Sequence, residues 1–544
     1  MATTDTYLAN PNLKKSGVQV EYTEEQVAEY IKCAKDIVYF IKKYVKIVNV
    51  DRGLVPFDLY PFQENMVNLF TKNRFVLTKM PRQSGKSTTV VAYMLWRILF
   101  TDSQSIAILA NKGALAREMV HRIQLAYENL PMWMQQGIVS WNKGSMELEN
   151  GSKIVAAATS SSAVRGGSYN LIFLDEFAFV PRNLAEDFFA SVYPTISSGS
   201  TSQVIIVSTP NGMNHFYKMW IDALEGRSGY KTLEVHWKDV PGRDEKWRDQ
   251  TIKNTSEEQF RQEFDCEFIG SNNTLINGMK LRQMPFIPPK EKRGDLDIFE
   301  PPINNHIYFA IADTARGIGL DYSALTIFDG TTIPYKMVAK YRNKDILPSV
   351  FPDLIRSIAT EYNDAFVLVE NNDIGGQVAD TLHRDLEYDN MIMTTVRGRG
   401  GQKVGGGFAK NSQIGVKTTQ QVKRIGCNSL KELIENDKLL IEDFDTLEEL
   451  ASFVSRRNSF MAEEGAHDDL VMTCVLFSWL IRQEYFKEMT DQDVRKLLAE
   501  EKARQLEQEM LPFGFYDDGT EEVIIDNNGD MWRQDSWAID TDRW

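Results

Sequence analysis

Residues 75–88 read FVLTKMPRQSGKST, and this stretch decides how the N-terminal half of the chain folds. Its first four residues form an apolar strand, and Val90 to Ile98 supply the apolar face of a following helix. Between the two, Gly85-Lys86-Ser87 predicts a phosphate-binding loop, because backbone N–H groups at a helix start surround phosphate oxygens and the lysine reaches the outer phosphates. Met80 stands where such loops usually have their first glycine, so the match is incomplete.

A second motif strengthens this prediction. Residues 171–176 read LIFLDE, an apolar strand that delivers two carboxylates at its C-terminal end. In an ATPase, Asp175 would hold Mg²⁺ together with the Ser87 hydroxyl, and Glu176 would polarise the attacking water. A strand that ends in an acidic turn is common by itself. A lysine-serine loop followed by an acidic strand end within one α/β unit is much less expected by chance, so we predict an ATPase.

Three smaller features fit an ATP site. The Gln63 amide is a candidate reader of the adenine edge, although a surface role is the simpler interpretation. Arg82 is a candidate finger in cis for the γ-phosphate, and its alternative is a surface cation. Ser208 and Thr209 end a strand on the nucleotide side and are candidates for sensing hydrolysis, or else belong to a hydroxyl-rich turn. The expected nucleotide contacts are Gln63, Arg82, Gln83, Ser84, Gly85, Lys86, Ser87 and Asp175.

Short apolar strands alternate with helical patterns between residues 75 and 209. The predicted strands are Phe75–Thr78, Ser105–Ala110, Ile154–Ala158, Leu171–Leu174 and Val204–Val207. Such alternation is typical of a mainly parallel sheet covered by helices. Upstream, Thr23 to Gln26 forms a capping box that predicts one amphipathic helix reaching about Val48.

A second set of acids lies in the C-terminal half. Strands are predicted at His306–Ala312, Ser323–Phe328 and Phe366–Val369, the second returning beside the first, and an apolar helix follows His467. The acids at their ends are Asp313, Asp321, Glu370, Asp468 and Asp469. Carboxylates that converge from strand ends and a helix start can hold two Mg²⁺ or Mn²⁺ ions for phosphodiester cleavage. Each acid alone is more simply a cap or a solvated group; their shared placement favours a nuclease.

Residues 397–424 form a glycine-rich basic stretch without any acid. Its cations are Arg397, Arg399, Lys403, Lys410, Lys417, Lys423 and Arg424. A flexible basic loop can follow a phosphate backbone without reading bases, so we favour DNA binding over a merely solvated loop.

The bulk composition limits the alternatives. The chain has 544 residues, 43% hydrophobic and 25% charged, with a formal net charge of −15. Such a charge argues against coating nucleic acid with the whole surface, but allows a local basic channel. There is no run of 18 apolar residues and no secretory signal, and four scattered cysteines form neither a CxxC pair nor a disulfide framework. We therefore expect a reducing cytoplasm and no membrane contact.

The expected domains follow from these patterns. They are an N-terminal helical extension (1–55), an ATPase motor domain (56–270), a proline-rich linker (271–305), a nuclease domain (306–487), and a charged helix with an acidic, tryptophan-bearing tail (488–544).

With these motifs in hand, the chain resembles the large subunit of tailed-bacteriophage terminases, most closely the headful-packaging, T-even type. The resemblance runs from about Tyr60 to Arg482. The most specific motifs are residues 82–87 (RQSGKS), 173–176 (FLDE), 209–212 (TPNG), 369–372 (VENN) and 467–469 (HDD). The loop of that family also lacks a glycine-rich start, so Met80 agrees with the resemblance.

The resemblance implies a P-loop ATPase of the RecA/ASCE type followed by an RNase H-like (RuvC-like) nuclease domain. It implies that Arg82, Lys86, Ser87, Asp175 and Glu176 run ATP hydrolysis, and that Ser208 and Thr209 couple it to DNA movement. Asp313, Glu370 and one of Asp468 and Asp469 would hold the nuclease Mg²⁺ or Mn²⁺, with Asp321 as a further ligand.

The implied activity is ATP-driven translocation of double-stranded DNA into a procapsid, with cleavage of concatemeric DNA. The implied partners are a small terminase subunit, the portal ring of the procapsid and further copies of the chain in a ring. The implied location is the host cytoplasm.

Two other classes remain open. A helicase or restriction-type translocase would need a second RecA-like domain after the linker. A capsid or portal protein would leave the acids as surface caps and the two ATPase motifs unexplained.

Overall fold

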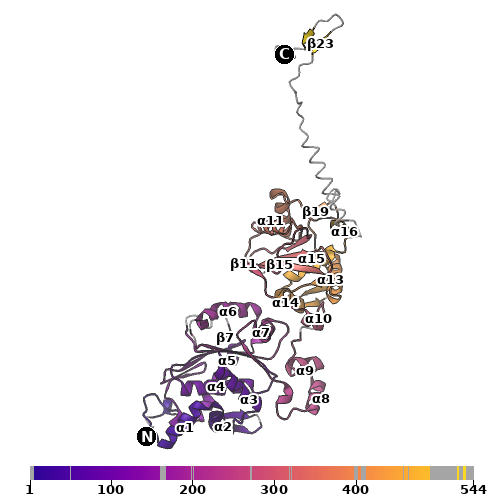
Figure 1. Cartoon of the computed structure of the whole chain (residues 1–544). Helices are drawn as coiled ribbons and strands as arrows, with labels where there is room; N and C mark the ends of the chain where they lie inside the picture. The colour runs from indigo at the N-terminus through magenta and orange to yellow at the C-terminus, as the bar shows by residue number, and fades with distance from the viewer. Residues whose placement is uncertain are drawn as a thin grey trace. The chain divides into compact units, whose positions relative to one another are not determined.

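A computed structural model describes residues 5–49, 51–159, 167–197, 199, 201–269, 273–317, 319, 321–396, 402–405, 412–456, 459–463, 465–490, 523–525 and 531–533. The chain divides into two compact units, Met1–Arg482 and Gln483–Trp544. The first unit contains two large sheets with separate hydrophobic cores (Figure 1).

The N-terminal segment contains two helices where one was expected. Helix α1 (Glu24–Lys35) starts with the predicted capping box between Thr23 and Gln26. Asp36 then leaves the helical conformation and accepts a hydrogen bond from the backbone of Tyr39, so it ends α1 and caps α2 (Ile37–Tyr44). Strands β1 (Lys46–Asn49) and β2 (Gly53–Pro56) follow as an antiparallel pair. A single helix to Val48 was therefore a wrong prediction.

The first sheet has eight strands in the order β10-β3-β9-β8-β4-β7-β6-β5. The strands from β10 to β7 are parallel, and β6 and β5 are antiparallel, which confirms the expected mainly parallel sheet. Their bounds are β3 (Phe75–Lys79), β4 (Ser105–Ala110), β5 (Ile138–Asn142), β6 (Ser145–Leu148), β7 (Lys153–Ala158), β8 (Leu171–Asp175), β9 (Gln203–Ser208) and β10 (Lys231–Glu234).

Helices cover both faces of this sheet. Figure 1 shows α3 (Pro61–Lys72) and α4 (Lys86–Phe100) on one side, and α6 (Arg182–Ser197) and α7 (His215–Leu224) on the other. Helix α5 (Gly113–Glu128) shares the core of α3 and α4. The helices α8 (Glu245–Asn254) and α9 (Glu257–Glu263) follow β10. Because the central strands are buried on both faces, they read as continuous apolar runs, which is why their bounds were predictable.

The second sheet has the order β11-β12-β15-β14-β13-β16, with β20 beside β15. All pairs along the main path are antiparallel except the parallel pair of β13 and β16. The bounds are β11 (Glu291–Arg293), β12 (Leu296–Ile298), β13 (Tyr308–Asp313), β14 (Ser323–Asp329), β15 (Tyr335–Asn343), β16 (Phe366–Val369) and β20 (Leu439–Leu440). A second RecA-like domain would need a mainly parallel sheet, so the helicase alternative does not fit.

The stretch 271–305, expected as a linker, is only partly one. It contains α10 (Gly278–Gln283) and the strands β11 and β12, which extend the second sheet through the pairing of β12 with β15. Its prolines and the exposed, charged β11 hid this pairing, because the short strands carry little apolar periodicity.

Two layers of helices enclose the second sheet. On one face, α11 (Phe351–Glu361) and α12 (Gly375–Asp380) pack on alternate residues of β13 and β16. On the other face lies α15 (Asp469–Leu480), whose Phe477 ring stacks on Phe328 with centroids 4.2 Å apart. Every residue of α15 is buried, which confirms the predicted apolar helix after His467. The neighbouring helices are α13 (Gln420–Glu435) and α14 (Phe444–Ser452).

Two small antiparallel sheets lie in the C-terminal half of the first unit. Strands β17 (Met393–Val396), β18 (Gln402–Val404) and β19 (Ser412–Ile414) form one small sheet, and β21 (Phe453–Arg456) and β22 (Ser459–Ala462) form a hairpin. In the second unit, α16 (Glu484–Thr490) and an antiparallel pair, β23 (Val523–Ile525) and β24 (Met531–Arg533), are described. Most of the predicted charged helix and tail lies outside the described residues. Within them, no helix combines the length and apolar character that crossing a bilayer requires.

Candidate active sites

The loop between β3 and α4 has the backbone conformation of an anion-binding turn. Gln83 and Gly85 have positive φ angles of 55° and 76°, and α4 begins directly after Gly85. At this φ of Gly85 a side chain would be strained, and its Cβ would also meet the Gln63 amide nitrogen at 2.6 Å, so glycine is favoured there. Met80 is fully buried and donates its backbone N–H to the Ser208 carbonyl at 3.1 Å, so no glycine is needed at that position.

Gln63 lies beneath this loop. Its Oε1 accepts from the Tyr60 backbone at 2.9 Å, and its Nε2 donates to the Ser84 carbonyl at 3.2 Å. The side chain is 1% exposed. Both ends of the amide are therefore engaged within the protein, and in this conformation Gln63 supports the loop and does not offer its amide to adenine.

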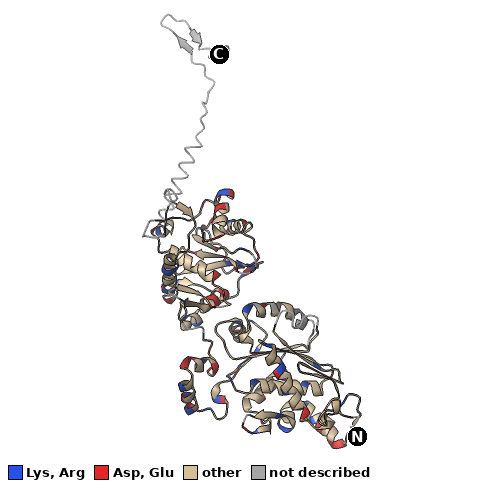
Figure 2. Cartoon of the chain, turned by 180° about the vertical axis from the view of Figure 1, so that it is seen from behind, with Lys and Arg blue, Asp and Glu red and all other residues tan. Residues whose placement is uncertain are grey.

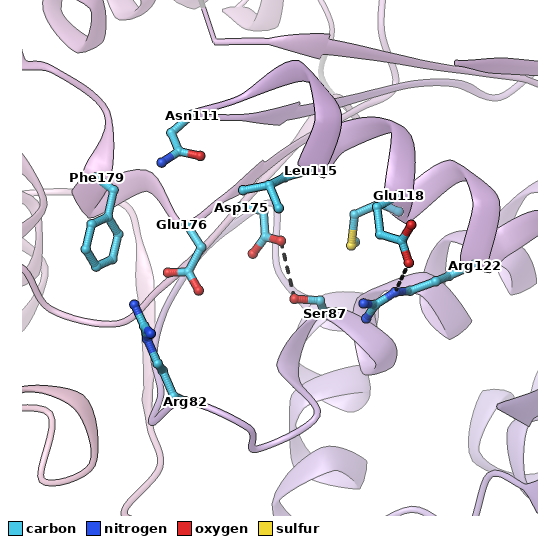
Figure 3. Close-up of a pocket in the computed structure, with 10 residues that line it drawn as sticks. Arg82, Ser87, Asn111, Leu115, Glu118, Arg122, Asp175, Glu176 and Phe179 are labelled. Atoms are coloured by element: carbon cyan, nitrogen blue, oxygen red, sulfur yellow. Dashed lines mark hydrogen bonds and ion pairs between the residues drawn. The ribbon is translucent and has the colours of Figure 1, made fainter. Parts of the chain in front are cut away.

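Three neighbouring strand ends assemble what we call the phosphate site, made of Lys86, Ser87, Asp175, Glu176 and Thr209. Strand β9 lies between β3 and β8, so Thr209 stands between the lysine loop and the two acids. The Lys86 ammonium lies 2.7 Å from Glu176 Oε1 and 3.3 Å from Thr209 Oγ1. Ser87 Oγ donates to Asp175 Oδ2 at 3.3 Å, as Figure 3 shows. The structure thus brings together the residues that the two motifs predicted.

The pKa values of the two acids of the phosphate site are shifted in opposite directions. Burial raises the pKa of Asp175 to about 6, and the Glu176 charge adds to this shift. Burial also acts to raise the pKa of Glu176, but the Lys86 charge and hydrogen bonds from Lys86 and Thr209 hold that pKa below its usual range. Asp175 Oδ1 is buried and accepts no hydrogen bond from the described residues. A cation beside Ser87 and Asp175 would satisfy that oxygen, as Mg²⁺ does in phosphate-loop enzymes.

A cavity of about 320 Å³ opens beside these acids. Figure 3 shows Arg82 and Glu176 directed into it. The Arg82 Nε lies 3.4 Å from Glu263 Oε2, and its side chain is 52% exposed. Arg82 lines the cavity but is paired with Glu263, so its role as a finger in cis stays a prediction. The remaining lining residues are Ser87, Asn111, Leu115, Glu118, Met119, Arg122, Asp175 and Phe179.

Arg243 supports the loop and was not predicted. Its Nη2 donates to the carbonyls of Arg82 and Gln83 at 2.9 and 3.0 Å, and its guanidinium lies 4.7 Å from the Trp247 ring centroid. These bonds hold the turn in which Gln83 has its positive φ. Arg243 is 160 residues from Gln83 in sequence, and no local pattern marks such a contact.

Ser208, the other predicted coupling residue, connects β9 with the segment after Glu176. Its hydroxyl accepts from the Ala178 backbone at 3.1 Å and donates to the Thr209 carbonyl at 2.8 Å. The neighbouring His215 ring contacts the Phe177 carbonyl through Nε2 at 3.0 Å. Burial lowers the pKa of His215 to about 4. Ser208 is thus placed to link the acid-bearing strand end to the rest of the domain.

The second set of acids, Asp313, Asp321, Glu370, Asp468 and Asp469, forms what we call the acidic site. Asp313 ends β13 and Glu370 follows β16, and these two strands are parallel neighbours. The Glu370 backbone donates to the Ala312 carbonyl at 2.9 Å, which sets the two carboxyls side by side. Burial and then the Glu370 charge raise the pKa of Asp313 well above its usual range, with Asp469 and Asp468 adding to the shift.

Gly375 allows a close turn behind Glu370. A Cβ atom at this position would lie 1.8 Å from the Glu370 carbonyl oxygen, whereas one on the adjacent Gly376 would stay 3.7 Å from its nearest neighbour. Gly375 is therefore required for the chain to turn back immediately after the acid.

The start of α15 supplies the remaining acids. Asp469 is 6% exposed, whereas the side chain of Asp468 is more open, and its Oδ2 lies 3.8 Å from the Lys423 ammonium. The buried Glu449 from α14 caps the helix, because its Oε2 accepts from the backbones of Leu470 and Val471 at 2.8 and 3.1 Å. Glu449 is a positioning residue that the sequence did not reveal, since acids on helices are usually solvated.

Asp321, His467 and Asp469 come closest together. One ligand atom from each lies within 4.8 Å of the other two. Hydrogen bonding to His467 holds the pKa of Asp321 below its usual range. Burial raises the pKa of Asp469 to about 9, and the Glu449 and Asp321 carboxyls add to this shift. A buried carboxyl among other acids is ready to exchange its proton for a divalent cation.

The predicted DNA-binding cations are only partly described. Lys403 lies on β18, Lys417 follows β19, and Lys423 and Arg424 lie in the first turns of α13. Arg397, Arg399 and Lys410 lie outside the described residues. Lys423 reaches the acidic site through its contact with Asp468. Figure 2 shows basic and acidic residues interspersed around both sheets, so any DNA track must be local, as the net charge also requires.

Comparisons with known proteins give matches to both the N-terminal and the C-terminal half of the chain. Residues 78–283 match a family model described as terminase large subunit, T4likevirus-type, N-terminal, and residues 310–479 match one described as terminase RNaseH-like domain. The terminase large subunits of Thermus virus P23-45 and Thermus phage G20c are each 24% identical over 366 residues, which cover 63% of this chain and 68% of each relative.

The similar solved structures are also phage large terminases, at low identity. The large terminase of HK97 bacteriophage is 14% identical with a TM-score of 0.46, over 81% of this chain and 99% of that protein. The large terminase of a thermophilic bacteriophage, solved in complex with ADP, is 11% identical with a TM-score of 0.34, over 77% and 98%. The large terminase nuclease of phage G20c with bound cobalt is 21% identical with a TM-score of 0.29, over 38% and 97%.

The two family models together span more than half of the chain, in the order that the motifs predicted. They confirm the expected fold class, a P-loop ATPase-type domain followed by an RNase H-like domain, and they rule out a purely structural capsid or portal protein. The chain therefore belongs to the terminase large subunits of tailed bacteriophages.

Proposed function

We propose that this chain uses ATP to move double-stranded DNA into a procapsid and cuts concatemeric DNA with a metal-dependent endonuclease. The strongest support is the presence of two distinct acidic centres in one chain. The phosphate site contains its own lysine on a phosphate-binding turn, whereas the acidic site gathers five carboxylates at two strand ends, a strand start and a helix start.

In the phosphate site, the loop backbone and Lys86 would bind the outer phosphates of ATP, and Ser87 with Asp175 would hold Mg²⁺. Glu176 orients the attacking water. Glu176 is paired with Lys86 at 2.7 Å, and a phosphate that draws Lys86 away would exchange this ion pair for its own. Thr209 donates its hydroxyl to Glu176 Oε2 at 3.0 Å and therefore senses that exchange. Arg82 supplies positive charge from the open side of the cavity.

In the acidic site, Asp313, Glu370, Asp469 and Asp321 would hold the divalent cations. Bound divalent cations would activate water and stabilise the departing oxygen. We assign the main helix ligand to Asp469, because it is the more buried of the two aspartates and follows Glu370 directly among the charges that shift the pKa of Asp313. Asp468, paired with Lys423, faces the basic stretch that we assign to the DNA backbone.

The relative solved with ADP and the G20c nuclease solved with cobalt or magnesium bind the kinds of group that these two sites are built to take. Family membership also supports a small terminase subunit, the portal ring and a homo-oligomeric ring as partners, with action in the host cytoplasm. We propose the working boundaries 56–270 for the motor and 306–487 for the nuclease, with β11 and β12 added to the latter.

The direct test of the nuclease is linearisation of supercoiled plasmid by the purified chain with Mg²⁺ or Mn²⁺. Asp313→Ala should remove cutting, whereas Asp353→Ala, an exposed acid in the first turn of α11, should leave it unchanged. Cutting that persists in Asp313→Ala would reject this assignment of the metal centre.

A further inference from the structure

The short segment that follows Glu176 is held by side chains that lie just before and at the start of α7. The Ala178 carbonyl accepts a hydrogen bond from Asn214 Nδ2 at 2.7 Å, and the Phe177 carbonyl lies 3.0 Å from His215 Nε2. Both carbonyls belong to fully buried residues. Because a buried carbonyl must find a donor within the protein, these two side chains take the place of water.

His215 is held in the form that donates to this segment. Burial lowers its pKa to about 4, so the ring is neutral at pH 7 and carries one proton. A carbonyl oxygen can only accept, and therefore the proton lies on Nε2, facing Phe177. The Phe177 ring also packs edge-on against the imidazole, with centroids 4.6 Å apart and planes at 80°. His215 thus contacts both the backbone and the ring of Phe177.

The backbone of Glu176 requires such support. Its φ and ψ angles of 50° and 45° lie in the left-handed region, which residues other than glycine seldom adopt. A conformation of this kind persists only where surrounding contacts hold it. From this backbone the Glu176 carboxylate contacts Lys86 at 2.7 Å and Thr209 Oγ1 at 3.0 Å, and Figure 3 shows it directed into the cavity. The bonds to the next two carbonyls therefore hold the turn that places the carboxylate.

Asn214 connects this turn to helix α7. Its Oδ1 caps the helix by accepting from the backbones of Phe216 and Tyr217 at 3.1 and 3.4 Å, while its Nδ2 donates to the Ala178 carbonyl. The cap needs only an acceptor, and the carbonyl needs only a donor. A substitution can therefore remove the contact with Ala178 and keep the cap of α7.

We propose that Asn214 is a positioning residue for ATP hydrolysis. Its amide N–H, together with the His215 ring, holds the turn after Glu176 and so places the carboxylate that orients the attacking water. This inference rests on the proposed ATPase function and adds a positioning residue to it. The hydrogen bonds of Asn214 go to Ala178 and to the start of α7, so its loss should slow turnover and leave nucleotide binding as it is.

The test measures ATP turnover by the full chain, together with the affinity for ADP and the unfolding temperature. Asn214→Asp keeps a cap acceptor of the same shape but places an oxygen against the Ala178 carbonyl, where the donor was. Asn214→Ser also keeps a cap acceptor and adds no charge, but its side chain is too short to replace the Nδ2 bond. The matched control is Asn277→Asp, because Asn277 caps α10 by accepting from the Met279 backbone at 2.8 Å.

We expect kcat for ATP to fall at least about ten-fold in both Asn214 variants, while the KM for ATP and the affinity for ADP stay within about two-fold of the wild type. The unfolding temperature should be unchanged, and Asn277→Asp should keep wild-type values throughout. An unchanged kcat in either Asn214 variant, or a loss of ADP affinity and thermal stability in parallel with kcat, would overturn the inference and leave the ATPase proposal standing. A wild-type chain that hydrolyses no ATP, alone or with DNA, would overturn both.

Discussion

The phosphate site and the acidic site both collect carboxylates at strand ends, yet the negative charge of these carboxylates is compensated differently in the two sites. In the phosphate site, Lys86 pairs with Glu176 and keeps the pKa of that acid low. In the acidic site, Asp313 and Asp469 have raised pKa values, because burial and neighbouring acids outweigh the available cations. The phosphate site thus carries a lysine that compensates Glu176, although burial raises the pKa of its Asp175 to about 6. In the acidic site, divalent cations would compensate the crowded carboxyls.

The largest expected effect follows from the removal of Lys86, the lysine of the phosphate site. Lys86→Ala should lower ATP turnover by about 10³-fold, because the phosphates lose their charged donor and Glu176 loses its partner. Phosphate release measured with and without DNA would show it. Lys72→Ala, an exposed lysine in the last turn of α3, is the control. Turnover retained in Lys86→Ala would mean that the loop does not hold the reacting phosphates.

A second prediction concerns the backbone behind Glu370. Gly375→Ala should reduce plasmid cleavage by about 10²-fold, because the new Cβ must displace the Glu370 carbonyl and with it the metal-binding carboxyl. Gly376→Ala should cost little cleavage, since its Cβ would meet nothing closer than 3.7 Å. ATP turnover should be the same in both variants. Equal cleavage by the two would show that the position of Glu370 is not critical.

A smaller effect is expected from the residue that caps α15. Glu449→Gln keeps the shape of the side chain but weakens its hold on the helix start and on Arg342. Plasmid cleavage should fall about ten-fold, with a parallel loss of Mn²⁺ affinity in calorimetric titration. Glu435→Gln, at the surface of α13, is the matched control. An unchanged metal affinity would remove Glu449 from the support of the acidic site.

A last effect is expected on stability, in the domain of the phosphate site. The pKa of His215 is about 4 in the folded chain and about 6.5 when unfolded, so between these values the unfolded state binds the extra proton. The free energy of unfolding should therefore fall by about 3 kcal/mol as the pH drops from 6.5 to 4. Urea unfolding across this range should show a shallower pH dependence for His215→Phe than for the wild type. As the control, His121→Phe at an exposed position should leave the pH dependence of the unfolding free energy unchanged. The same pH dependence in all three proteins would contradict a buried, neutral His215.

The sequence predicted β3, β4, β7, β8 and β9 of the first sheet almost to the residue, because strands such as Leu171–Asp175 and Gln203–Ser208 are buried on both faces and read as unbroken apolar runs. It did not predict β5, β6 and β10. The loop and the strand-end acids were predictable for the same reason, since parallel strands must end at one edge. Strand β15 was missed because Lys336, Lys340 and Arg342 interrupt its pattern.

What the sequence could not predict were contacts made across the fold. Arg243 contacts the phosphate loop, and Glu449 contacts the start of α15. The partners are far apart in the sequence, so no local pattern marks these contacts. Gln63 was a candidate base reader or, more simply, a surface residue, but it is buried and its amide bonds Tyr60 and Ser84. His467 was visible within its motif, but its proximity to Asp321 depends on how β14 and α15 pack. Side-chain identity predicted which chemistry was available, and tertiary packing decided which groups meet.

We expect the phosphate site and the acidic site to act separately, and measuring both activities on the same two variants tests this separation. Folded Lys86→Ala should lose ATP turnover and still linearise plasmid with Mn²⁺, and folded Asp313→Ala should do the reverse. If either variant lost both activities while remaining folded, the separation of an internally balanced phosphate site from a cation-dependent acidic site would be wrong.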